Sequence, residues 1–159
     1  MQHRQYAEYL LHPRGRGLSS LTIPFEIKGQ DWSLIPDFLI NPTIEFLAID
    51  SYYCKLLMAS SQELISGSFP NLKALTIYQS GSRQKIDELC RLLRSCDLQF
   101  FCLEQPSRTE SLTQSDTAEL LSCLQRQQNL KVMALNIRHC GPCLGKQGIP
   151  WSNLKALYI

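Results

Sequence analysis

Apolar residues recur along most of the chain with the spacing L-x-x-L-x-L. The pattern is clearest in residues 71–75 and 153–157, which both read Asn-Leu-Lys-Ala-Leu, and in residues 129–133, which read Asn-Leu-Lys-Val-Met. Extending this spacing defines six segments, whose first positions are Leu18, Ile44, Leu72, Leu98, Leu130 and Leu154. These positions lie 26, 28, 26, 32 and 24 residues apart. We interpret the pattern as an internal repeat with a period of about 27 residues.

Each segment predicts a short strand. The first, fourth and sixth positions of the spacing, here called the frame, are apolar in all six segments; in the third segment they are Leu72, Leu75 and Ile77. Positions four and six are two residues apart, so they point to the same side of a strand. Pro70 and Asn71 favour a turn just before this strand. Because one strand cannot bury its apolar side alone, we expect the six to stack into a parallel sheet with a continuous core.

Helices are expected between some of the strands. Helical spacing is shown by Ile86, Leu89, Cys90, Leu92 and Leu93. Asp116, followed three residues later by Glu119, resembles a capping box with Asp116 as the N-cap. Right-handed crossovers would place such helices on one outer side of the sheet.

This organisation resembles the leucine-rich repeat family over residues 17–159, as about six repeats with the last one truncated; residues 1–16 would form a partial repeat or an N-terminal helix. The resemblance implies an α/β solenoid, with a parallel sheet on the concave face and helices or loops on the convex face. Typical members carry Asn or Cys three residues after the sixth frame position, where this chain has Glu26, Tyr52, Ser80, Pro106 and Arg138. The set is therefore divergent, and we expect it to be a fragment of a longer protein.

The divergent repeats most resemble the helix-bearing type of intracellular proteins. This type includes F-box ubiquitin-ligase receptors and nucleotide-binding innate-immune receptors, although the sequence contains neither an F-box nor a phosphate-binding loop. The resemblance implies a non-enzymatic protein-protein interaction module that binds a protein or peptide on its concave surface, such as the recognition part of one of these receptors. The candidate partner-binding residues on that surface are Phe46, Lys73, Tyr78, Phe100, Lys131 and Tyr158.

Composition narrows the classes of partner. The 159 residues carry a formal charge of +2, which argues against a nucleic-acid partner. An alternative is that Lys73, Lys131 and Lys155 form a basic stripe that binds nucleic acid. No apolar run approaches the ~20 residues of a membrane helix, and no secretory signal is apparent, so no membrane partner is expected. Seven cysteines, an odd number, favour a reducing cytoplasmic compartment.

One motif suggests an alternative function. Cys140-Gly-Pro-Cys143 is the dithiol core of thioredoxin-like proteins and would make the chain a thiol-disulfide oxidoreductase. That chemistry needs a helix to begin at the first thiol, whereas Gly145, Gly148 and Pro150 disfavour one. Zinc could bind the same pair with His139, but a structural site needs four ligands and no second pair is present. We therefore expect no enzyme activity, cofactor or metal.

Overall fold

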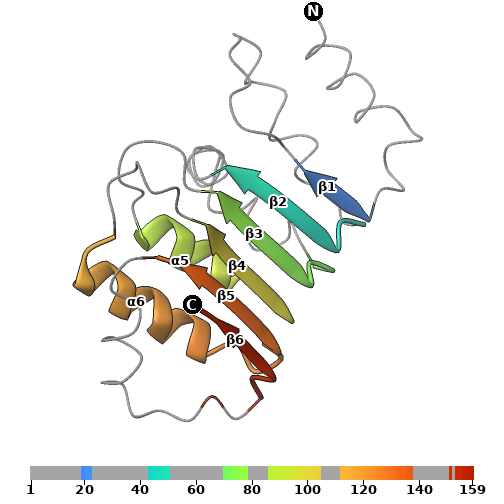
Figure 1. Ribbon diagram of the computed structural model, residues 1–159. Coiled ribbons are helices and arrows are strands. Elements are labelled where there is room, and N and C mark those ends of the chain that lie inside the picture. Colours follow the sequence, from blue (N-terminus) through green and yellow to red (C-terminus); the bar gives the residue numbers. More distant parts are fainter. Residues whose placement is uncertain are drawn as a thin grey trace, which may run out of the picture.

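The structure is a computed structural model, which describes residues 19–22, 43–50, 70–78, 86–104, 112–137, 151 and 153–159. Their main feature is a parallel sheet of six strands, whose spatial order follows the order of the chain (Figure 1). The strands are β1 (Ser20–Thr22), β2 (Phe46–Asp50), β3 (Ala74–Tyr78), β4 (Phe100–Glu104), β5 (Val132–Asn136) and β6 (Ala156–Tyr158). The predicted α/β class and parallel sheet are confirmed.

The frame residues hold the strands in register. Leu47 on β2 lies beside Leu75 on β3, and Leu75 lies beside Phe101 on β4. The sixth positions form a second row, in which Ile77 lies between Ile49 and Leu103. These side chains are almost fully buried. A slip of one residue would move every frame side chain to the opposite face, so burial of the frame fixes this register.

A backbone ladder joins the strands just before they begin. The carbonyl oxygen of Lys73 accepts hydrogen bonds from two backbone N–H groups, those of Gln99 (2.8 Å) and Phe100 (3.0 Å). The carbonyl oxygens of Ser19, Glu45, Gln99 and Lys131 make the same pair of bonds to the next strand. Each strand therefore begins at the same level as its neighbour.

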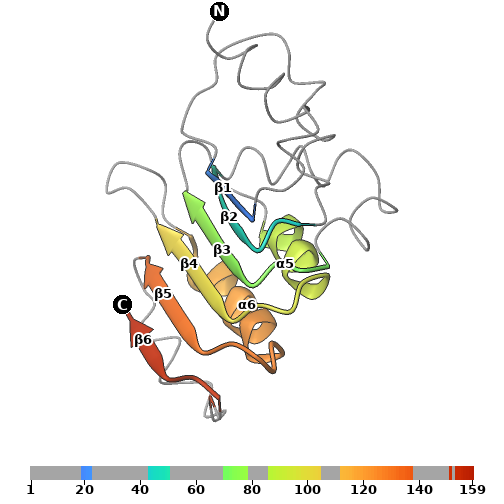
Figure 2. The ribbon, with the colours of Figure 1, turned by 90° about the vertical axis from the view of Figure 1, so that its right-hand side faces the viewer.

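Within the described ranges, two helices lie on one side of the sheet: α5 (Ile86–Arg94), between β3 and β4 in the chain, and α6 (Gln114–Gln125), between β4 and β5 (Figure 2). In α5, the buried residues are those that the helical spacing picked out. In α6, the predicted capping box is wrong: the N-cap is Thr113, whose hydroxyl oxygen accepts a hydrogen bond from the Asp116 N–H (3.1 Å). The Asp116 carboxylate in turn accepts one from the Thr113 N–H (3.0 Å), so Asp116 is the third residue of the helix, not its cap.

The turns before β4, β5 and β6 are joined by side-chain amides. Gln127 donates to the carbonyl oxygen of Leu93 (2.6 Å) and accepts from the N–H of Leu98 (3.1 Å), which ties the end of α6 to the turn after α5. Asn153 donates to the carbonyl oxygen of Gln128 (2.6 Å). The asparagine that begins the Asn-Leu-Lys-Ala-Leu block of residues 153–157 thus bonds back to the preceding turn.

The core lies between the sheet and the helices and thins out at β6. Leu75 is fully buried, whereas Leu157 at the equivalent position of β6 is 40% exposed and Ile159 is 68% exposed. The continuous core expected from the frame therefore does not extend fully to β6, because within the described part of the chain Leu157 has a strand on one side only. The helix expected in residues 1–16 and the frame residues Leu18 and Ile23 lie outside the described residues.

Candidate functional site

The candidate site is the side of the sheet opposite α5 and α6, here called the open face. Side chains alternate along a strand, so residues between frame positions point to this face. Across the sheet they form two rows. One row contains Ser20, Phe46, Ala74, Phe100, Val132 and Ala156, and the other contains Thr22, Ala48, Thr76, Cys102, Ala134 and Tyr158.

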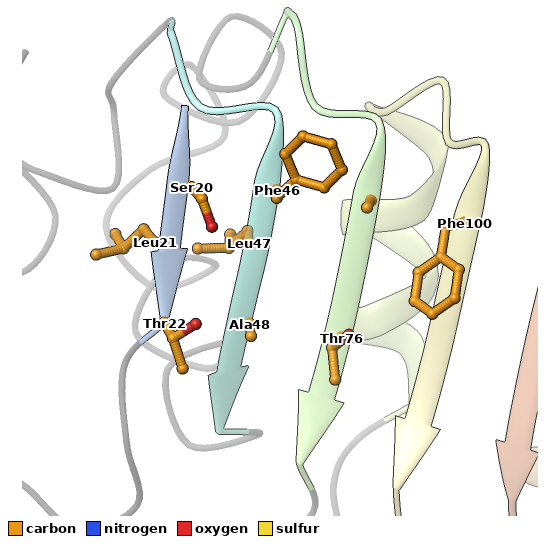
Figure 3. A pocket seen from close by; sticks show the side chains of 9 residues that line it. Ser20, Leu21, Thr22, Phe46, Leu47, Ala48, Thr76 and Phe100 are labelled. Atoms are coloured by element: carbon orange, nitrogen blue, oxygen red, sulfur yellow. The ribbon is translucent and has the colours of Figure 1, made fainter. Parts of the chain in front are cut away.

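A groove with a volume of about 370 Å³ crosses β1 to β4 on the open face. Phe46 and Phe100 project from this face on either side of β3, as Figure 3 shows. Between them in register lies Ala74, whose small side chain leaves the space between the rings open. Two strand spacings of ~4.8 Å separate the two phenylalanine backbones by ~10 Å. The groove is lined by Ser20, Leu21, Thr22, Phe46, Leu47, Ala48, Ala74, Thr76 and Phe100.

The predicted aromatic residues divide between this groove and other parts of the sheet. Phe46 is 48% exposed and Phe100 is half-buried, and both line the groove. Tyr158 is 63% exposed on β6, four strands away from Phe46. Tyr78 is half-buried at the end of β3, where it lies in register between Asp50 and Glu104. The structure thus brings Phe46 and Phe100 together and leaves the tyrosines at the periphery.

The predicted lysines lie in the row where the strands begin, and they differ in their partners. Lys73 forms an ion pair with Glu45, with 3.0 Å between Nζ and Oε1. Lys131 donates a hydrogen bond to the neutral side chain of Gln99 (3.3 Å). The positive charge of Lys73 is therefore balanced within the sheet, whereas that of Lys131 is not balanced by this contact.

Thiols near the open face and in the core are held in their protonated form. Burial raises the pKa of Cys102, and the carboxylate of Glu104 raises it further. Burial also raises the pKa of Cys96, to about 11. In the interface between α5 and α6, burial and then contact with the thiol of Cys123 raise the pKa of Cys90. A thiolate is the reactive form of cysteine, so these groups are poor nucleophiles at neutral pH.

The dithiol motif, Cys140 and Cys143, and its possible zinc ligand His139 are not among the residues that the structure describes. Within the described ranges, no group of three or more His, Cys, Asp or Glu side chains is arranged to hold a metal ion. No helix in that part of the chain is long and apolar enough to cross a membrane.

Sequence reasoning did not single out the small residues that form the groove. Ala48, Ala74 and Thr76 line it, and Ala74 has a small side chain where its neighbours in register, Phe46 and Phe100, have large ones. The signal that could have found them is the alternation of Phe46, Ala74 and Phe100 at one position of successive segments. Glu45 was also missed as a partner of Lys73, because their pairing depends on the register between β2 and β3.

The chain matches no protein-family model, no curated protein and no solved structure at a significant level.

Proposed function

We propose that this chain is a non-enzymatic interaction module of the leucine-rich repeat type, which binds an extended segment of a protein, or a peptide, on the open face of its sheet. The supporting observation is the groove between Phe46 and Phe100, over the small residues Ala74 and Thr76. Aromatic side chains that flank a pocket are typical anchors of protein interfaces.

The arrangement of the sheet supports the solenoid part of this proposal. The strands follow one another in chain order, all parallel, and the same backbone ladder joins each pair. Stacked repeats of this kind use a sheet surface for binding because it is broad and rigid. The buried frame on the other side of β2 to β5 holds the open-face residues of these strands in place, so the groove is preformed and little ordering is required of the protein on binding.

A peptide-display selection tests the proposal. A random twelve-residue library is selected on the purified chain, and the selected peptides are then measured for affinity to a Phe46→Ala/Phe100→Ala variant. We expect the double variant to weaken binding by at least tenfold, since interface anchors typically contribute more than about 1 kcal/mol each. A matched control is Asp87→Asn, an exposed position on α5, which lies on the far side of the sheet.

The control should leave the affinity unchanged, and both variants should keep the circular dichroism spectrum of the parent chain. Selected peptides that bind the Phe46→Ala/Phe100→Ala variant as tightly as the parent would contradict the proposed surface. Peptides that lose affinity to Asp87→Asn instead would place the interface on the helices.

A further inference from the structure

Two exposed lysines, Lys131 and Lys155, lie next to each other where β5 and β6 begin. Lys131 and Lys155 are both exposed and occupy equivalent positions on neighbouring strands, where the Lys155 N–H donates to the Lys131 carbonyl oxygen (2.7 Å). Neither side chain has an ion-pair partner among the described residues, whereas Lys73, in the same row, is paired with Glu45. Like charges on adjacent strands repel each other, so a carboxylate placed between Lys131 and Lys155 would be favourable.

The distance from the groove to these lysines sets a spacing for the partner. Ala74 of β3 lies in register between Phe46 and Phe100, and the midpoint between β5 and β6 lies two and a half strand spacings from β3, or ~12 Å at ~4.8 Å per strand. An extended chain rises ~3.3 Å per residue, so four residues span ~13 Å. Side chains four residues apart in an extended chain also point to the same side. One side chain can therefore enter the groove while the other reaches the lysines.

We propose that the segment bound by the open face is acidic: a large apolar side chain enters the groove between Phe46 and Phe100, and an Asp or Glu four positions away lies between Lys131 and Lys155. The inference rests on the proposed function and adds the chemistry and spacing of the partner. It is carried by charge complementarity, because Lys131 and Lys155 are exposed without an ion-pair partner among the described residues, whereas Lys73, which precedes the groove residue Ala74, is paired with Glu45.

The same random twelve-residue library provides the test, read by sequencing the selected peptides. We expect enrichment of Trp, Phe or Leu together with Asp or Glu four positions before or after it. Selection on a Lys131→Gln/Lys155→Gln variant should keep the apolar anchor and lose the acidic preference. The matched charge control is Arg91→Gln, an exposed position on α5, which should keep both preferences.

A double-mutant cycle on the best peptide gives the magnitude. Replacing its acidic residue with Asn or Gln should weaken binding to the parent chain by about threefold to tenfold, and to the lysine variant by less than twofold, as expected for exposed charge pairs. Fluorescence anisotropy in low and high salt measures these affinities, and the difference between acidic and neutral peptides should shrink as salt rises.

The outcomes separate this inference from the proposed function. Peptides that share an apolar anchor without an acidic preference, and that lose affinity to Phe46→Ala/Phe100→Ala, would overturn the inference and leave the proposed function standing. Peptides whose affinity is the same for the parent chain, the Phe46→Ala/Phe100→Ala variant and the Lys131→Gln/Lys155→Gln variant would overturn the inference and the proposed function together. A fluorescein-labelled oligothymidine that binds the lysines more tightly than the best acidic peptide would overturn the inference in favour of a nucleic-acid partner.

Discussion

Replacing Leu75 with alanine tests which side of the sheet carries the core. Leu75 is fully buried in the middle of the sheet, between Leu47 and Phe101 on the adjacent strands. Both neighbours are held by their own strands, so the site cannot collapse around the lost side chain. Leu→Ala substitutions in such cores cost about 2.7–5 kcal/mol, and the upper half of that range is expected here.

Two further alanine variants, at more exposed positions, show how the loss of unfolding free energy depends on burial. Leu157 occupies the same frame position on β6 but is 40% exposed, so its replacement should cost only about 1–2 kcal/mol, the transfer free energy of the part that is buried. Phe46 is 48% exposed on the open face, and Phe46→Ala should likewise cost about 1–2 kcal/mol. Urea unfolding followed by circular dichroism gives the three free energies of unfolding. Equal losses from Leu75→Ala and Phe46→Ala would refute the assignment of core and surface.

Three further predictions concern the side chains of Gln127, Thr113 and Cys96. Gln127→Ala removes both hydrogen bonds that tie the end of α6 to the turn after α5 and should cost about 1–3 kcal/mol in urea unfolding, whereas the exposed Gln128→Ala should cost little. Thr113→Ala should cost about 1 kcal/mol through the lost cap of α6, and Thr113→Ser should restore it. Burial raises the pKa of Cys96 from 9.0 to about 11, so the folded chain keeps this proton to higher pH than the unfolded chain. The contribution of this pKa shift to the free energy of unfolding is complete below pH 9 and is lost as the pH rises to about 11. In urea unfolding at a series of pH values, the free energy of unfolding should therefore fall less steeply over this range in Cys96→Ala than in the parent chain.

The sheet could be predicted from the sequence because its determinants are local and periodic. Apolar residues two apart, such as Leu75 and Ile77, specify one buried side of a strand, and the recurrence of the pattern brings the strands together. The α6 cap was assigned to the wrong residue because Thr113 and Asp116 are both good cap-forming residues. The choice between them depends on the residue at which the backbone becomes helical, which no single side chain specifies.

The groove and its charges were harder to predict because they depend on register between distant residues. Phe46 and Phe100 were identified as exposed aromatics, but the gap between them exists because Ala74 lies between them in register. Lys73 was grouped with Lys131 as a binding residue, although Glu45 on the neighbouring strand neutralises its charge. Sequence reasoning found the side chains, and the pairing of strands decides which of them cooperate.

The central claim is that the open face, and not the helical side, binds the partner. Chemical-shift perturbation of backbone amides, measured by NMR while a display-selected peptide is titrated into the labelled chain, tests it most directly. We expect the largest shifts at Phe46, Ala74 and Phe100, with the amides of α5 and α6 unchanged. Shifts concentrated on α5 and α6, with those three amides unaffected, would contradict the claim.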